Sequence, residues 1–297
     1  MTTRVLVATD LHPAADEAIR QAHAWAGTED AFAVSHVLPN LQPISLLFPQ
    51  RHQAAIFDVV ELLNRAENAV RQRVAQLTGR APDSFEVFID QGVDYAEITR
   101  RAAAWKADVV FVGNHNDTPL EHLLIGSTTE RVARYCQCAV LVARPSPSTG
   151  PVIAATDLSD PSLPAIHAGA REASRRKAPL TVVNAIDFMF PPAIAAGGFF
   201  GLVPTTYSAE AIVEMEKDAK AKLDATLKTA KVEGEARVLV GDAVVTIVSE
   251  VAERQAQLVV VATHGRTGLA HVALGSVAEK VMRNASCSVL VVRLATT

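Results

Sequence analysis

The stretch Val5-Leu6-Val7-Ala8-Thr9-Asp10-Leu11 decides the fold of this chain, because it occurs twice. It returns as Val152-Ile153-Ala154-Ala155-Thr156-Asp157-Leu158, and farther along the chain the offset between matching residues settles at 149. At that offset, 16 of the 36 positions from Val109 to Arg144 are identical to their counterparts, without a gap. An internal match of this length indicates two copies of one structural unit.

The boundary between the copies lies in Pro145-Ser146-Pro147-Ser148-Thr149-Gly150-Pro151. A polar, proline-rich stretch without apolar periodicity is typical of a stiff linker. We therefore expect an N-terminal domain over residues 1–146 and a C-terminal domain over residues 151–297. Each has a common size for one domain and is long enough to bury its own core.

Strand-like and helix-like segments alternate within each copy. Val109–Gly113 and Leu258–Ala262 are apolar at consecutive positions, which is typical of parallel strands covered by helices on both faces. Repeated βα units of this kind predict an α/β fold, here two tandem doubly wound domains. In the first copy we expect strands at 5–8, 31–38, 85–89, 109–113 and 139–144, and helices near 14–25, 53–77, 95–104 and 127–135.

Bulk composition excludes several classes of protein. Of the 297 residues, 49% are hydrophobic and 20% are charged, so the sequence is neither disordered nor of low complexity. A net charge of −4 offers no basic surface to a phosphate backbone, which argues against nucleic acid as a partner. Three cysteines fit a reducing compartment, and we identify no signal peptide, so we expect a cytoplasmic protein.

Residues 188–207 carry no charge over about the length of a membrane span. Three prolines and three glycines within them would interrupt a helix, so we expect an apolar loop and no membrane span. Three roles stay open for this loop: packing over the sheet edge or against the partner domain, closing over a ligand, and docking to a protein or a membrane.

Two features of each copy follow the ends of expected strands, where ligands bind in this architecture. Asp10 or Asp157 comes directly after the first strand, and a glycine-bearing loop after the fourth strand leads into a helix that begins at Gly-Ser. Glycines let backbone N–H groups approach a phosphate, and a helix N-terminus adds unpaired donors and a positive dipole end. The carboxylate suits a ribose hydroxyl or a metal ion on the phosphates.

The Thr-Asp pair, the glycine loop and the closing Gly275-Ser276-Val277-Ala278-Glu279 resemble the universal stress protein family in its tandem two-domain form. The resemblance covers essentially the whole chain, twice. It implies a five-stranded parallel sheet in each domain, and pairing of the domains through their last strands, Ala139–Ala143 with Ser288–Val292. It further implies binding of ATP or a related adenine nucleotide and a role in stress survival. A homodimer stays open.

Nucleotide-binding members of that family carry Gly-x2-Gly-x9-Gly followed by Ser or Thr after the fourth strand. The second copy offers Ala262, Gly265, Gly275 and Ser276 at these positions, and the first offers Gly113, Asn116, Gly126 and Ser127. Each copy therefore departs from the pattern at one glycine. Asparagine tolerates positive φ better than most residues, so the departure in the first copy is compatible with the turn.

The two loops also differ in charge, because Asp117 in the first copy stands where Arg266 stands in the second. A carboxylate repels phosphates, whereas an arginine donates charge-assisted hydrogen bonds to them. We therefore expect the better nucleotide site in the C-terminal domain, with Asp157 also a candidate for holding Mg²⁺ through the nucleotide. The expected residues of that site are Asp157, Ala262, His264, Gly265, Arg266, Gly275, Ser276 and Val277, and those of the weaker site are Asp10, Gly113, Asn116, Gly126 and Ser127.

Structural roles stay open for several of these residues. Ser127-x-x-Glu130 and Ser276-x-x-Glu279 have the spacing of capping boxes. Asp10 and Asp157 are positioned as caps of the first helix in each copy.

The histidines and cysteines are interpreted mainly as structural. The histidines that recur in both copies, among them His115 and His122, show no spacing typical of a metal site. Cys138 and Cys287 hold the same repeat position ahead of a buried strand, which favours core packing; Cys136 is a minor candidate for redox chemistry.

Three functions follow from these patterns. The leading hypothesis is a cytoplasmic stress-response regulator that binds an adenine nucleotide chiefly in its C-terminal domain. The second is a scaffold or interaction protein that holds no nucleotide. The third is a slow ATPase. The sequence has no Gly-x4-Gly-Lys loop and no clearly placed base to activate water, which argues against this function. We therefore assign no catalytic residue and expect at most weak hydrolysis.

Overall fold

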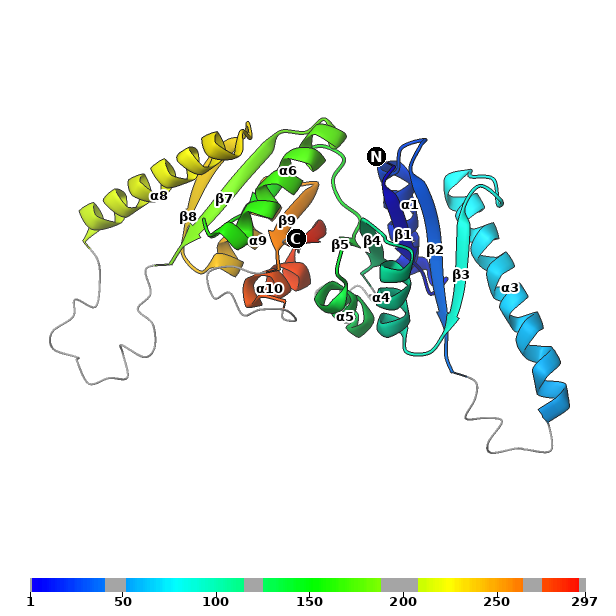
Figure 1. Ribbon diagram of the computed structural model, residues 1–297. Coiled ribbons are helices and arrows are strands. Elements are labelled where there is room, and N and C mark those ends of the chain that lie inside the picture. Colours follow the sequence, from blue (N-terminus) through cyan, green and yellow to red (C-terminus); the bar gives the residue numbers. More distant parts are fainter. Residues whose placement is uncertain (1, 41–51, 115–124, 188–207, 264–273, 294–297) are drawn as a thin grey trace, which may run out of the picture. The chain divides into compact units, whose positions relative to one another are not determined.

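The computed structural model describes residues 2–40, 52–114, 125–187, 208–263 and 274–293 (Figure 1). The described chain forms two compact units. The first is built from Met1–Pro145 and also takes in Ser288–Arg293 near the end of the chain. The second is built mainly from Ser146–Leu269 and Gly275–Cys287.

Strands and helices alternate in the first unit as expected. Its first five strands are β1 (Arg4–Ala8), β2 (Ala31–Leu38), β3 (Glu86–Gln91), β4 (Val109–Gly113) and β5 (Ala139–Ala143). Its helices are the short 3₁₀ helix η1 (Pro13–Ala15), α1 (Asp16–Trp25), α3 (His52–Thr78), α4 (Asp94–Ala104) and α5 (Ser127–Tyr135). The five strands are parallel in the order β3-β2-β1-β4-β5, so the connections reverse direction between β1 and β4.

The second unit repeats this plan. It contains β6 (Val152–Ala155), η3 (Asp160–Ser162), α6 (Leu163–Arg176), β7 (Leu180–Ile186), α8 (Ala209–Ala230), β8 (Glu235–Val240), α9 (Ala243–Glu253), β9 (Leu258–Ala262) and α10 (Ser276–Asn284). Its strands are parallel in the order β9-β6-β7-β8. The α/β class and the tandem doubly wound organisation are thus confirmed.

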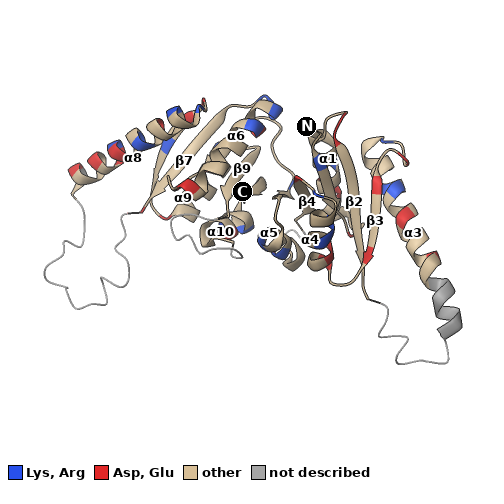
Figure 2. Ribbon diagram, viewed as in Figure 1, with Lys and Arg blue, Asp and Glu red and all other residues tan. Residues whose placement is uncertain are grey.

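The core of each unit lies around its middle strands. The first four residues of β4 and of β9 are buried, and Phe111 in β4 packs edge-on against Trp25 of α1 with 5.9 Å between ring centroids. Burying one such aliphatic or aromatic side chain contributes roughly 1.5–3 kcal/mol to the stability of a fold. Figure 2 shows that residues of both charge signs lie along α8.

The last strand, β10 (Ser288–Val292), belongs to the first unit and runs antiparallel to β5. Val289, Leu290 and Val291 face Val142, Leu141 and Val140. This is the pairing of Ala139–Ala143 with Ser288–Val292 that the family resemblance implied. It covers an edge of β5 whose backbone N–H and C=O groups would otherwise lack partners.

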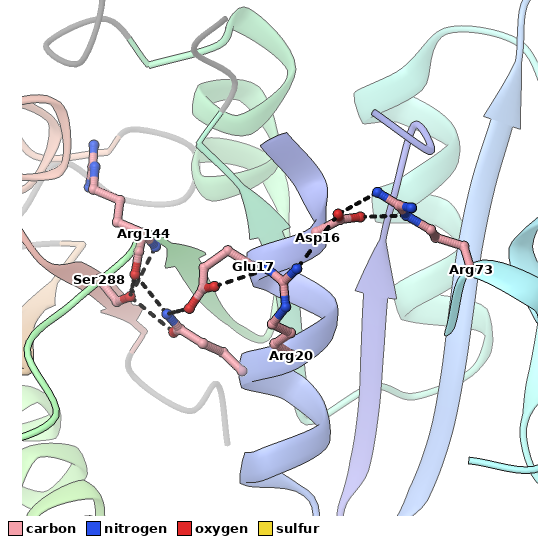
Figure 3. Close-up of polar contacts among 7 residues, drawn as sticks. Asp16, Glu17, Arg20, Arg73, Arg144 and Ser288 are labelled. Atoms are coloured by element: carbon pink, nitrogen blue, oxygen red, sulfur yellow. Dashed lines mark hydrogen bonds and ion pairs between the residues drawn. The ribbon is translucent and has the colours of Figure 1, made fainter. Parts of the chain in front are cut away.

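A polar cluster joins β10 to the end of β5 (Figure 3). The Ser288 hydroxyl accepts a hydrogen bond from the Arg144 backbone N–H at 3.0 Å. Its own proton has two acceptors within reach, Gln21 Oε1 at 2.9 Å and the Arg144 carbonyl at 3.1 Å. Gln21 also donates to that carbonyl at 2.7 Å, so helix α1, β5 and β10 are held by one network.

A second polar contact ties α1 to α3. The carboxylate of Asp16 is almost fully buried and accepts two hydrogen bonds from the guanidinium of Arg73, at 2.8 and 2.5 Å (Figure 3). A bidentate pair of this kind fixes orientation as well as charge. It sets how α3 lies against the helix that follows β1.

Within the described chain, no helix combines the length and the apolar character needed to cross a membrane. Residues 188–207, for which we expected an apolar loop, lie outside the described residues.

We predict that Ser288→Ala lowers the free energy of unfolding by about 1–3 kcal/mol, because it leaves the buried Arg144 N–H without its acceptor. Urea denaturation followed by circular dichroism measures the effect. Ser286→Ala, two residues earlier at an exposed position, is the control and should change stability by less than about 0.5 kcal/mol. Equal values for the two variants would contradict the structural role of this hydroxyl.

Candidate functional site

A cavity of about 320 Å³ lies in the first unit at the carboxyl ends of the strands. Because β1 and β4 are neighbours with opposite connections, this is the switch point at which doubly wound folds bind ligands. The cavity is lined by the turn after β1, by β2, by the end of β4 and by the first turns of α4 and α5; the polar lining residues are Thr9, Asp10, Ser35, Asp94, Ser127, Thr128 and Thr129.

The turn after β1 is organised by its own side chains. Asp10 Oδ1 accepts from the His12 N–H at 2.9 Å, and Thr9 Oγ1 accepts from the Leu11 N–H at 3.0 Å. These bonds hold Leu11 at a φ of 66°, a conformation that leucine rarely adopts. His12 is the residue that caps η1, and α1 begins after Ala15. The interpretation of Asp10 as the cap of the first helix is therefore wrong.

The second unit contains the same turn. Asp157 Oδ1 accepts from the backbone N–H and from the hydroxyl of Ser159, at 3.0 and 2.5 Å. Leu158 has a φ of 63°, and Ser159 is the N-cap of η3. Asp157 is thus also a turn residue and not a helix cap. In both units the carboxylate is fixed at the carboxyl end of the first strand.

Both turns also have a buried support that the sequence analysis missed. The ring of His36 on β2 lies with Nδ1 2.8 Å from the Thr9 carbonyl. In the second unit, Asn184 on β7 donates to the Thr156 carbonyl at 2.9 Å. An imidazole and an amide therefore contact equivalent backbone carbonyls. Only the register of the neighbouring parallel strands could have shown that His36 and Asn184 hold equivalent positions.

Gly113 ends β4 beneath the turn. A Cβ atom at this position would lie 2.9 Å from the Ala14 carbonyl oxygen and 2.9 Å from the Ala15 Cα. The glycine is therefore required by the close approach of the η1 backbone, independently of any ligand. The second unit has Ala262 at the end of β9.

The helix that closes the site begins differently from the expectation. Gly126 is the N-cap of α5, with extended φ and ψ of −61° and 143°, and the first intrahelical bond runs from the Glu130 N–H to its carbonyl. Ser127 is therefore the first helical residue, and the Glu130 carboxylate accepts from Arg134 at 2.9 Å. The capping box expected for Ser127 and Glu130 is not formed.

Helix α10 begins in the same way. Gly275 is its N-cap, with φ and ψ of −60° and 144°, and Glu279 pairs with Arg283 at 3.0 Å. The expected capping box of Ser276 is thus also wrong. Because a glycine N-cap has no side chain to offer, the first N–H groups of both helices point outward without a side-chain cap. Such a helix start attracts anions.

Asp94, the first residue of α4, was not expected at the site from the sequence. It lines the cavity, and its Oδ2 accepts from the Thr128 hydroxyl at 3.3 Å. At the offset of 149 its counterpart is Ala243, and that of Thr128 is Val277. The match of Gly92 with Gly241, two residues earlier, was the signal that could have revealed this difference.

Several expected site residues lie outside the described chain: Asn116 and Asp117 of the first copy, and His264, Gly265 and Arg266 of the second. The recurring histidines His115, His122 and His271 do so as well. Of the second site, Asp157, Ala262, Gly275, Ser276 and Val277 are described, and they come from one edge of the β6–β9 pair. Among the described residues, no group of three or more His, Cys, Asp or Glu side chains is arranged to hold a metal ion.

The comparison with known sequences decides the family. The sequence profile of the universal stress protein family matches residues 1–144 and again residues 149–293. The chain belongs to the universal stress protein family. It therefore carries two universal stress protein domains in tandem, as the internal repeat indicated.

Individual relatives agree with this assignment. A universal stress protein of Mycolicibacterium smegmatis is 27% identical over 304 residues, which cover 97% of this chain and 96% of the relative. A solved protein of unknown function from Pseudomonas aeruginosa PAO1 shares the fold, with a TM-score of 0.64 at 18% identity over 98% of this chain and 92% of that one. A universal stress protein solved in complex with cAMP matches 48% of this chain and 96% of its own, with 29% identity and a TM-score of 0.31.

We predict that Gly113→Ala destabilises this universal stress protein by about 1–3 kcal/mol, because the added methyl group overlaps the η1 backbone. The matched control is Ala262→Gly at the equivalent position of the second domain, which should cost less than about 1 kcal/mol. Urea unfolding measures both. The packing argument fails if Gly113→Ala is as stable as the native protein.

Proposed function

We propose that this universal stress protein is a cytoplasmic stress-response regulator that binds ATP or a related adenine nucleotide, chiefly in its C-terminal domain. One observation carries the proposal: each domain has, at the carboxyl ends of its parallel strands, a helix start capped by glycine and a carboxylate fixed by its own turn. The first supplies donors to phosphates, and the second suits a ribose hydroxyl or a metal ion on the phosphates.

The proposed C-terminal site is assigned residue by residue. Gly275 and Ser276 supply the backbone N–H groups at the start of α10, and the Ser276 hydroxyl is exposed beside them. His264, Gly265 and Arg266 stand in the loop between β9 and α10, where the arginine would contribute positive charge and both side chains would contribute donors to the phosphates. Ala262 ends β9 before this loop, and Val277 is the second residue of α10 after it.

Charge supports the preference for the C-terminal domain. The proposed N-terminal site, made of Asp10, Gly113, Asn116, Gly126 and Ser127, has Asp94 in its cavity lining and Asp117 in its loop. The counterparts in the second domain are Ala243 and Arg266. Each additional carboxylate near a phosphate chain costs on the order of 1 kcal/mol in a partly screened pocket. Asp94 therefore adds to the asymmetry that the loop sequences imply.

Asp157 is the proposed ligand for a magnesium ion carried by the nucleotide. Its carboxylate is oriented by Ser159. A single carboxylate suits a Mg²⁺ ion whose other ligands are water molecules and phosphate oxygens. The ion would neutralise phosphate charge. No residue is assigned to the hydrolysis of ATP.

A scaffold function is the second candidate, and exposed apolar side chains favour it. Val60 and Leu62 on α3, and Val213 and Met215 on α8, have exposed fractions of 58%, 38%, 59% and 40%. Apolar side chains at such positions suit contact with another protein or with a second copy of the chain. A scaffold of this type would hold no nucleotide, so nucleotide titration distinguishes the two functions.

We expect about one equivalent of ATP per chain in a calorimetric titration, because loop charge disfavours the N-terminal site. Asn116→Gly combined with Asp117→Arg should raise the stoichiometry to about two, since Asp10, Gly126 and Ser127 are already present. Titration with cAMP and with GTP tests which nucleotide is preferred. The proposal fails if none of the three nucleotides binds, and the charge argument fails if the native chain binds two equivalents with equal affinity.

Asp157→Ala should weaken ATP binding at least about tenfold and abolish its dependence on magnesium, because the substitution removes the proposed metal ligand. Asp10→Ala is the matched control, which removes the equivalent carboxylate from the weaker site and should leave the single binding event unchanged. Titrations with and without MgCl₂ measure both variants. Equal magnesium dependence in the native and Asp157→Ala proteins would restrict Asp157 to holding its turn.

A further inference from the structure

Two thiols lie together at the far end of helix α5 from the cavity. Cys136 is the C-cap of the helix, and its N–H donates to the Val132 carbonyl at 2.9 Å. Cys138 follows two residues later, directly before β5, and the two Sγ atoms are 3.3 Å apart. Both residues are free cysteines; Cys136 is buried, with 1% of its surface exposed, whereas Cys138 is partly exposed.

An arginine from the end of the chain lies beside this pair. Arg293 follows β10, and its Nη2 donates to the carbonyls of Ala133 and Arg134 in the last turn of α5, at 3.0 and 2.5 Å. These bonds fix a partly buried guanidinium, whose charge acts on Cys136. A fixed positive charge favours the thiolate over the thiol.

The two sulfur atoms are consequently not equivalent. The hydrogen bond from Cys138, opposed by burial and aided by the charge of Arg293, lowers the pKa of Cys136 to about 7. The pKa of Cys138 is raised, first by the bond to Cys136, then by burial and by the negative charges of Cys136 and Asp108. Near neutral pH a substantial fraction of Cys136 is therefore thiolate, whereas Cys138 stays a protonated thiol.

Core packing does not require this pair, because the second domain fills the same place without it. Ala285 is the C-cap of α10 with φ and ψ of −65° and 139°, compared with −63° and 138° for Cys136. Its N–H makes the same bond to Val281, at 2.9 Å. The cysteine that follows, Cys287, is buried like a core residue. An alanine thus meets the structural needs of the position.

We propose that Cys136 and Cys138 form a redox-active dithiol that a small hydroperoxide oxidises reversibly to an intramolecular disulfide. The Cys136 thiolate attacks the terminal peroxide oxygen and breaks the O–O bond, which gives a sulfenic acid and, after protonation, water or an alcohol. The Cys138 sulfur then attacks the sulfenic sulfur, loses its proton and releases a second water. The two thiols lose two electrons, and the peroxide gains them.

The geometry allows this closure. The sulfur atoms must approach by about 1.3 Å to reach the bond length of a disulfide, which is roughly 2.05 Å. Cys136 is the non-helical residue after α5, and Cys138 lies directly before β5, so neither cysteine lies within a helix or a strand. A resolving thiol next to a low-pKa thiol is typical of redox-sensing cysteines.

The test is oxidation of the full-length, reduced protein with equimolar hydrogen peroxide. After quenching, iodoacetamide alkylation under denaturing conditions and mass spectrometry should find two fewer alkylated thiols and a disulfide in the peptide that contains both residues. Cys287 should remain alkylated, and dithiothreitol should restore all three thiols. The proposal is overturned if the native protein keeps three thiols, or if Cys136 gains oxygen without forming the disulfide.

Two variants assign the roles. Cys136→Ala, which copies the second domain, should fold normally and oxidise at least about tenfold more slowly, since only high-pKa or buried thiols remain. Cys138→Ala should instead accumulate a sulfenic acid at Cys136, which dimedone traps. Oxidation of Cys136→Ala at the native rate would refute the assignment of Cys136 as the attacking thiol.

The pH dependence of the native reaction gives an independent measure. With a pKa near 7, the thiolate fraction of Cys136 and the oxidation rate should rise about tenfold between pH 6 and pH 8 and then level off. An ordinary thiol with a pKa of about 8.5 would give a rise of roughly 75-fold and no plateau by pH 8. Arg293→Gln keeps a donor for the helix carbonyls but removes the positive charge. The oxidation rate of this variant should therefore rise at a higher pH than that of the native protein. A profile of the ordinary kind in the native protein would refute the proposal.

Discussion

An exposed edge strand leaves a row of backbone N–H and C=O groups without partners, and a parallel sheet adds the demand that both of its faces be covered. In the first unit this constraint applies to β5, because β5 is the last of the parallel strands in the order β3-β2-β1-β4-β5. The antiparallel strand β10, which comes from the second copy of the repeat, pairs with this edge of β5. A buried polar cluster around Ser288 and Arg144 then fixes the register of the two strands. The duplication of the sequence therefore has a direct structural use.

The parallel arrangement also determines where chemistry is possible. It brings the ends of β1 and β4 to one edge of the sheet, so the turn of Asp10 and the start of α5 line the same cavity. Two requirements meet there. Gly113 is demanded by contact with the η1 backbone, and Gly275 by the Thr263 carbonyl oxygen, which a Cβ atom would approach to 2.9 Å. As N-caps, Gly126 and Gly275 also leave the first helix N–H groups without a side-chain cap. Only the missing caps bear on ligand binding.

Most of the fold could be predicted from the sequence, because apolar periodicity reports burial directly; the expected strand at 109–113 and helix at 127–135 match β4 and α5. The interpretation of the helix starts was less successful. Ser-x-x-Glu has the spacing of a capping box, yet the chain enters both helices one residue earlier, at glycine, and the glutamates pair with arginines in the next turn. Capping depends on the φ and ψ of a single residue, which residue types alone do not determine. Asp94 was missed because its partner, Thr128, is distant in sequence.

Helix α5 connects the two chemically distinctive places of the first domain. It has nine residues and is therefore about 14 Å long. Its dipole places partial positive charge at one end and partial negative charge at the other. Its positive end, at Gly126 and Ser127, favours an anion in the cavity. Its negative end would by itself disfavour a thiolate at Cys136, and the guanidinium of Arg293 reverses this effect by binding the last carbonyls. Arg293 follows β10, so the strand that pairs with β5 also delivers a charge that adds to the hydrogen bond from Cys138 in lowering the pKa of Cys136.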